Sequence, residues 1–132
     1  MSKLTSEQAN ELANNFLGLA QAIGDFRYQN WNSLLKNENQ KLGNLQSSIL
    51  NYGEDILAFS TMLVMDEVET SLKRIDQITL QIKSTIHTLK NIQKVINIAA
   101  AIVTFGAAIL NKDPQSITKA LDGIFKASEE DQ

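Results

Sequence analysis

Residues 66–110 read DEVETSLKRIDQITLQIKSTIHTLKNIQKVINIAAAIVTFGAAIL, with an apolar residue at every seventh position. The residues of this repeat are Val68, Ile75, Ile82, Leu89, Ile96, Val103 and Leu110. On a helix they form one continuous stripe. Further apolar residues beside them make the stripe wider than a two-stranded seam. The stretch therefore predicts one long, uninterrupted helix that packs against two or more others.

The composition restricts the classes of protein to consider. A chain of 132 residues is expected to form one domain, here residues 1–132. Its net charge of -3 argues against DNA or RNA as a partner, and its lack of cysteine excludes disulfides, thiolate metal ligands and thiol nucleophiles. The first residues contain no apolar segment of the signal-peptide type. We therefore expect a cytoplasmic protein, or one exported without a cleaved leader.

Two long helices are expected before the heptad repeat, because apolar residues recur there every three or four positions. The expected apolar faces are Leu12, Phe16, Leu19, Ile23 and Phe26 in the first helix and Leu45, Ile49, Tyr52, Ile56, Phe59 and Leu63 in the second. The first begins at a capping box formed by Thr5 and Gln8. Gly24 either ends this helix or lies inside it, at a cost of about 1 kcal/mol relative to alanine. We favour a helix that continues to about residue 36 with Trp31 in the core, while the burial of Tyr28 stays open. A polar turn at 36–40 then leads into a second helix at 39–64.

Capping residues set the limits of the remaining helices. Asp66 and Glu69 predict the start of the long helix, and Asp113 with Pro114 predicts the start of a fourth helix at 114–127. The fold expected from this order is all-α, an elongated antiparallel bundle of three long helices plus a short C-terminal fourth helix.

The three long helices of this bundle are expected to differ in length. At about 1.5 Å per residue, the first two helices are each about 40 Å long and the third about 65 Å, so the third is expected to extend past its neighbours. The chain has no charged residue between Lys94 and Lys112, which makes the extending end apolar on all sides. We expect something to cover this apolar hairpin region, residues 95–127.

Small residues occur within the hairpin region. Ala100, Thr104 and Ala108 recur every four residues, which lets another backbone approach closely. Three alternatives remain for what covers the apolar hairpin region: the fourth helix of the same chain, a second copy or helical partner, or membrane lipid. The residues expected to make the contact are Ile96, Ile98, Ala100, Ile102, Val103, Thr104, Phe105, Gly106, Ala108, Ile109, Leu110, Leu121 and Phe125.

No pattern for catalysis or ligand binding is present. The single histidine, His87, lies off the heptad stripe between two lysines and is expected to face solvent. The sequence contains no zincin, P-loop, dinucleotide-binding or EF-hand motif. We therefore expect no catalytic residue, no metal, no cofactor and no small-molecule substrate.

The order of long amphipathic helices, an uncharged segment rich in Ala and Gly at 98–110 and a short returning helix resembles the helical pore-forming toxins of the cytolysin A and haemolysin BL type. The resemblance covers residues 66–127. It implies an elongated helical bundle whose apolar hairpin enters membranes on assembly. The leading hypothesis is a non-enzymatic interaction protein that assembles with itself or with a partner through the hairpin. The alternative is a membrane-active protein that inserts residues 95–110 into lipid.

Overall fold

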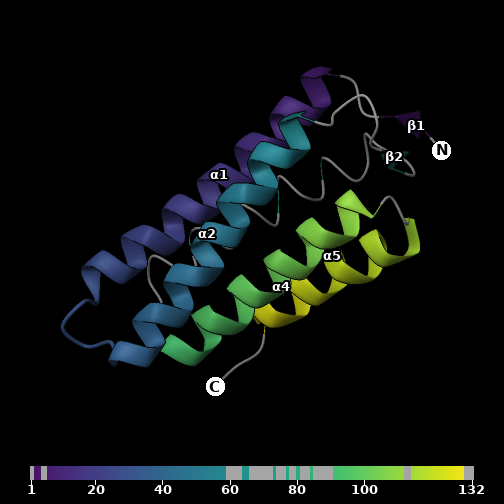
Figure 1. Ribbon diagram of the computed structural model, residues 1–132. Coiled ribbons are helices and arrows are strands. Elements are labelled where there is room, and N and C mark those ends of the chain that lie inside the picture. Colours follow the sequence, from purple (N-terminus) through teal and green to yellow (C-terminus); the bar gives the residue numbers. More distant parts are fainter. Residues whose placement is uncertain are drawn as a thin grey trace.

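The computed structural model describes residues 2–3, 6–58, 64–65, 91–111 and 114–129, together with residues 73, 77, 80 and 84. The described helices are α1 (Ser6–Gln29), α2 (Lys36–Ala58), α4 (Ile92–Leu110) and α5 (Pro114–Glu129). A two-residue strand near the N-terminus, β1 (Ser2–Lys3), pairs antiparallel with β2 (Val64–Met65). The predicted all-α bundle is confirmed, because the helices pack against one another with a shared apolar core (Figure 1).

The helices form two antiparallel pairs. Helices α1 and α2 lie side by side, and α4 and α5 form a hairpin that lies along them (Figure 1). Helix α4 is the element that joins the pairs, because it contacts both α2 and α5. Helix α1 contributes to this core the apolar face that was expected for the first helix. The buried residues of that face are Leu12, Phe16, Leu19, Ile23 and Phe26.

Helix α1 continues through Gly24, as predicted, but it ends at Gln29 rather than near residue 36. The Asn30 side-chain amide donates a hydrogen bond to the Phe26 carbonyl oxygen at 2.9 Å. Asparagine side chains that bond the backbone in this way compete with helix continuation. Residues 30–35 therefore form the turn, and Trp31 is 58% exposed, so the prediction that it lies in the core is wrong.

The polar run at 36–40 begins α2 instead of forming the turn. The Glu38 carboxylate accepts a hydrogen bond from the Leu35 backbone amide at 2.8 Å. This bond is one of the two that make a capping box. In it, the acidic side chain at the third helical position accepts a hydrogen bond from the backbone amide of the N-cap residue. The second helix was expected to reach residue 64, which is wrong because Val64 belongs to strand β2. The described part of α2 ends at Ala58, and residues 59–63 lie outside the described residues.

The prediction of one uninterrupted helix over residues 66–110 is wrong at Asn91. This residue has extended backbone, with φ −89° and ψ 106°, and its side-chain oxygen accepts a hydrogen bond from the Lys94 amide at 3.2 Å. Asn91 therefore caps a separate helix, α4. Before it, residues 73, 77, 80 and 84 are helical and exposed, at spacings of three and four. The predicted caps at Asp66, Glu69, Thr5 and Asp113 lie outside the described residues.

The predicted apolar overhang is consequently also wrong. With 19 residues, α4 is shorter than α1, which has 24. It lies within the length of the α1–α2 pair rather than past its end (Figure 1). Ile98 and Ile102 are fully buried and Phe105 is 2% exposed. The charge-free segment is therefore apolar because it supplies the core of this bundle.

Two glycines allow three helices to meet at Phe16. Its ring stacks on the Phe105 ring with a centroid separation of 5.8 Å and an interplanar angle of 22°. A Cβ added to Gly106 would lie 2.7 Å from the Tyr52 ring and 3.0 Å from the Phe16 ring. A Cβ added to Gly53 would lie 3.1 Å from the Phe16 Cβ. A side chain at Gly106 would have to displace the Tyr52 ring, whereas one at Gly53 would need the Phe16 Cβ to move by a few tenths of an ångström.

Gly106→Ala is expected to lower the free energy of unfolding by about 1 kcal/mol or more, because overpacking the three-helix contact outweighs the gain in helix propensity. The matched control is Gly123→Ala in α5, where an added Cβ meets nothing within 4 Å. This second change is expected to raise the free energy of unfolding by about 1 kcal/mol. Urea denaturation of both variants measures the difference. Equal effects in the two variants would contradict the packing described for Gly106.

Asn91→Ala tests the break between the heptad repeat and α4. Loss of the cap is expected to lower the free energy of unfolding by about 1 kcal/mol. If the helix instead ran through residue 91, alanine would stabilise it. Asn44→Ala, at an exposed position inside α2, is the control and is expected to be slightly stabilising. A stabilising effect of Asn91→Ala in thermal or urea denaturation would refute the cap.

Candidate interaction surface

The structure divides the residues expected to make contacts into a buried group and a smaller accessible one. Eight are buried inside the bundle, namely Ile96, Ile98, Ile102, Phe105, Gly106, Ala108, Ile109 and Leu121. Val103 and Leu110 are half-buried, while Ala100, Thr104 and Phe125 are exposed. The buried group stabilises the fold, so that a partner of the folded chain would meet the exposed and half-buried residues.

The outward face of α4 is small and uncharged. Its exposed positions are Gln93, Ala100 and Thr104, and the C-cap residue Asn111 that follows the helix is exposed as well. The Thr104 hydroxyl donates to the Ala100 carbonyl oxygen at 3.1 Å, and the Gln93 side-chain amide donates to the Asn97 side-chain oxygen at 3.0 Å. These bonds hold polar side chains against their own helix. The face therefore has low relief and presents methyl groups and backbone to solvent.

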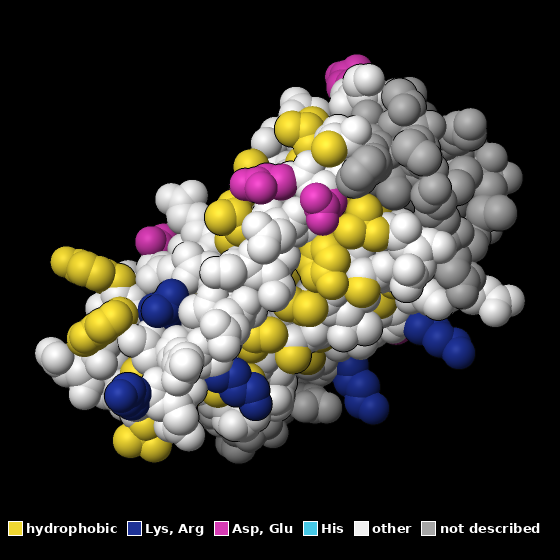
Figure 2. Space-filling view, viewed as in Figure 1, with side chains coloured by type: hydrophobic (Ala, Val, Ile, Leu, Met, Phe, Trp, Pro, Cys, Tyr) yellow, Lys and Arg dark blue, Asp and Glu magenta, His cyan; other side chains and the backbone are white. Residues whose placement is uncertain are grey.

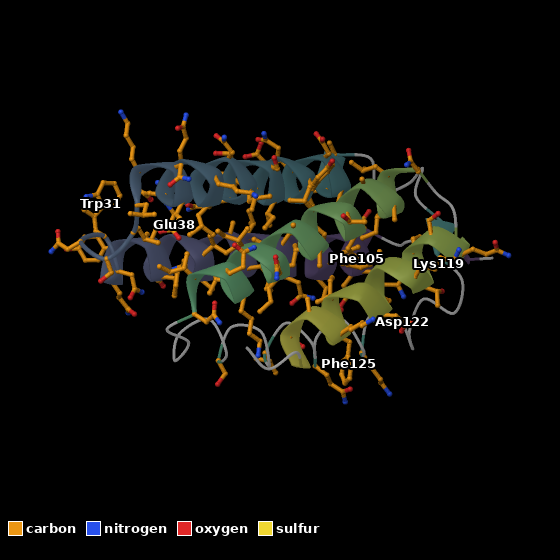
Figure 3. All side chains as sticks on the ribbon, turned by 90° about the horizontal axis from the view of Figure 1, so that it is seen from below. Trp31, Glu38, Phe105, Lys119, Asp122 and Phe125 are labelled. Carbon is orange, nitrogen blue, oxygen red and sulfur yellow. The ribbon has the colours of Figure 1, made fainter. Side chains whose placement is uncertain are left out.

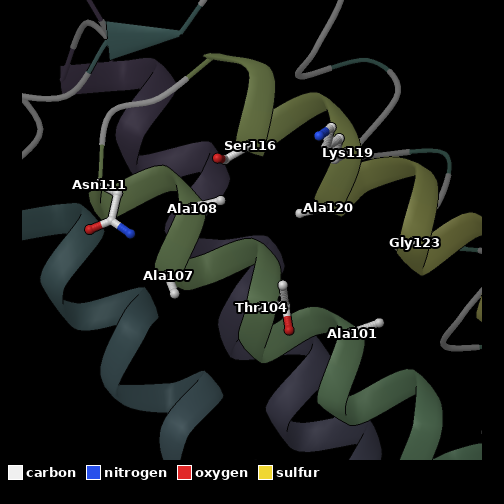
Figure 4. Close-up of a pocket in the computed structure, with 9 residues that line it drawn as sticks. All are labelled: Ala101, Thr104, Ala107, Ala108, Asn111, Ser116, Lys119, Ala120 and Gly123. Atoms are coloured by element: carbon white, nitrogen blue, oxygen red, sulfur yellow. The ribbon is translucent and has the colours of Figure 1, made fainter.

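A groove of about 500 Å³ runs between this face and α5 (Figure 4). Its α4 side consists of Ala101, Thr104, Ala107, Ala108 and Asn111, and its α5 side of Ser116, Lys119, Ala120 and Gly123. Most of the lining is small because α4 and α5 place Ala and Gly where larger side chains would fill the space. Asn111 and Ser116 lie toward one end and Ala101 and Gly123 toward the other, with Thr104, Lys119 and Ala120 between them, so that one end is polar and the other is formed by small residues (Figure 4).

Helix α5 positions its half of the groove by its own amphipathic pattern. Ile117, Leu121 and Ile124 are buried, and Ala120 is 7% exposed. Ser116, Lys119 and Gly123 lie beside that buried stripe, at the three- and four-residue spacing that keeps side chains on one helix face. Phe125, at 37% exposure, is not part of the lining. Lys119 is the one ionisable residue among the residues that line the groove.

The polar side chains of the groove lining are those of Thr104, Asn111, Ser116 and Lys119. The lining contains no Asp, Glu, His, Tyr or Cys. Among the described residues, no group of three or more metal-ligating side chains lies together. His87 lies outside the described residues. The groove can accept apolar side chains along most of its length and form hydrogen bonds at its polar end.

Comparisons with protein-family models, curated proteins and solved structures found no match for this chain.

The sequence analysis found the α4 side of the groove and named the fourth helix as one of three coverings for it, but it missed the α5 residues that line the groove. Ala100, Thr104 and Ala108 were expected to form a close-approach seam, and Thr104 and Ala108 do line the groove. The α5 residues were not singled out. Their signal was a small or flexible side chain at Ser116, Ala120 and Gly123, repeating at the same four- and three-residue spacing as the seam on α4.

Proposed function

We propose that this protein is a non-enzymatic helical interaction module that assembles with itself through the groove between α4 and α5, or with a helical partner that uses the same groove. The observation that carries the proposal is the lining of that groove, which is open to solvent, made largely of Ala, Gly, Ser and Thr, and about 500 Å³ in volume. Small residues at such a surface let a second helix come close enough for its side chains to enter.

The same chain carries an apolar ridge of the kind that fits this groove. On α2, Leu50 and Leu57 lie seven residues apart and are 40% and 50% exposed. Spacing of seven places them on one helix face. Glu54 and Asp55 between them are exposed and acidic, whereas the groove carries a lysine, Lys119. Figure 2 shows acidic side chains near the end of α2 and hydrophobic side chains along the bundle.

Contact between a groove and a ridge joins two different patches of the same chain. Such heterologous contacts extend head to tail until they close into a ring or form a filament. The leucine side chains bury apolar surface in the groove, worth about 25 cal/mol per Å² before the costs of association. The charge pair between Lys119 and the acidic residues mainly sets the orientation and the rate of encounter.

Thr104→Arg is expected to block the groove, and Leu57→Arg to disrupt the ridge, because each places a long charged side chain at an apolar contact. Either variant alone is expected to weaken self-association by at least about tenfold, the effect of 1.4 kcal/mol. A mixture of the two variants retains one intact groove and one intact ridge. The mixture is expected to form dimers that extend no further, as measured by analytical ultracentrifugation.

The control for these changes is Asn44→Arg, an exposed α2 position that faces away from the ridge residue Leu50 by helical geometry. It should assemble as the unchanged chain does. A chain that remains monomeric at all concentrations tested would contradict self-assembly. Failure of the mixture to dimerise, when the unchanged chain does assemble, would contradict the pairing of groove with ridge.

The alternative proposal, insertion of residues 95–110 into lipid, has one observation in its favour. Helix α4 is long and apolar enough to cross a membrane, although half of it is buried in the bundle. Insertion requires Ile98, Ile102 and Phe105 to leave the core. It is therefore accompanied by leakage of vesicle contents and by loss of the α1–α4 contact. Assembly through the groove predicts no leakage, which separates the two proposals in a dye-release measurement.

A further inference from the structure

Three large apolar side chains stand exposed at the turn that joins α1 to α2. Tyr28 is 84% exposed, Trp31 is 58% exposed and Leu35 is 64% exposed. Trp31 lies at one end of the bundle, away from Phe105 and Lys119 (Figure 3). Hydrophobic side chains protrude from the surface at this end (Figure 2). We refer to Tyr28, Trp31 and Leu35 together as the aromatic tip, which is separate from the groove.

Hydrogen bonds hold the backbone of the aromatic tip in one conformation. The Ser33 and Leu34 amides both donate to the Asn30 carbonyl oxygen, at 2.9 and 3.0 Å. The Leu35 amide donates to the Glu38 carboxylate at 2.8 Å. These bonds satisfy the amides of Ser33, Leu34 and Leu35 within the turn, while Trp31 and Leu35 keep their side chains exposed. Display of apolar side chains on an ordered turn lowers the entropic cost of binding.

Arg27 fixes the two helices beneath the tip. Its Nε donates to the Asn39 side-chain oxygen at 2.7 Å, and its Nη1 donates to the Gln46 side-chain oxygen at 2.8 Å. A Cβ added to Gly43 would lie 3.1 Å from the guanidinium carbon, so glycine makes room for this side chain. The end of α1 is thereby joined to the first turns of α2. The tip cannot easily fold back onto the bundle.

The charge around the tip is positive although the chain as a whole is negative. Residues 25–41 hold three basic and two acidic residues, against a net charge of -3 for the whole chain. Lys36 and Lys41 are exposed, as is Asp25, whereas Glu38 is half-buried and accepts the hydrogen bond from Leu35. The fully accessible charges of this range are therefore two lysines and one aspartate, with a positive sum.

We infer that the aromatic tip is a peripheral anchor for an anionic membrane surface. Tryptophan and tyrosine prefer the headgroup region of a bilayer, since each has an apolar body and a polar group. Lysines next to them are attracted to acidic lipids by about 1 kcal/mol each. A convex tip with separate protruding side chains fits a soft lipid interface better than the flat, close-packed core of a protein interface. Binding leaves the bundle folded and does not depend on the proposed self-assembly.

The experiment uses the full chain, in which Trp31 is the single tryptophan. Its fluorescence therefore reports the tip without labelling. With vesicles of phosphatidylcholine and phosphatidylserine, the emission is expected to move to shorter wavelength and to be quenched by lipids brominated near the headgroup. Vesicles of phosphatidylcholine alone are expected to give a much smaller change. Emission unchanged by the anionic vesicles would overturn the inference and direct the tip toward a protein partner.

Variants distinguish membrane binding through the aromatic tip from nonspecific membrane binding by other parts of the chain. In a flotation assay with the anionic vesicles, Trp31→Ser is expected to lower the partition coefficient about tenfold. Lys36→Glu is expected to lower it by at least about fivefold. The matched control is Leu17→Ser, which removes a leucine of 39% exposure on α1, outside the tip, the groove and the ridge, and should leave partition unchanged. Equal losses for Leu17→Ser and Trp31→Ser would overturn the assignment to the tip, with circular dichroism showing that each variant is folded.

Discussion

The close approach of three helices at Phe16 is the constraint on which the arrangement of this bundle depends. The ring of Phe16 stacks on Phe105, and Gly53 and Gly106 remove the side chains that would otherwise hold α2 and α4 apart. Since this contact directs Phe105 and Gly106 inward, the opposite face of α4 must point to solvent. The orientation of α4 thus follows from one aromatic pair and two glycines, and the small, uncharged groove beside α5 follows from that orientation.

The inward packing of α4 also explains its apolar composition, from which an uncovered helix end was predicted. Helix α4 has no charged residue from Val95 to Leu110, a pattern found both in membrane-spanning helices and in the central helices of soluble bundles. In this chain most large residues of the segment are buried, Val103 and Leu110 are half-buried, and the exposed residues are Ala100 and Thr104. The apolar character is therefore divided by size, with bulky side chains inside and small ones outside. Hydropathy averaged along the helix does not detect that division.

Periodicity predicted the fold class, but it did not locate the two places where the chain turns. Apolar spacing identified the faces of the first two helices, and residues such as Phe16 and Ile49 are buried as expected. At Asn91 and at Asn30, however, the apolar spacing continues across a break made by an asparagine side chain that bonds the backbone. Such a bond depends on a side-chain rotamer and leaves no trace in hydrophobic periodicity. The seam on α4 was predictable and the fourth helix was one of the three coverings left open for it, whereas the choice of α5 among them and the exposure of Trp31 required the tertiary structure.

Two parts of this molecule have a composition that suits lipid, and their energetic requirements differ. For α4 to enter a bilayer, the faces of α1 and α2 that it covers must meet water or another partner. Loss of burial costs about 1.5–3 kcal/mol for each large side chain exposed, and Phe16 and Ile49 are among the fully buried ones. Several such losses are comparable with the whole stability of a small domain. The aromatic tip has no equivalent cost, because Tyr28, Trp31 and Leu35 are already exposed. Contact with lipid through the tip is therefore compatible with the folded bundle, whereas contact through α4 requires the bundle to open.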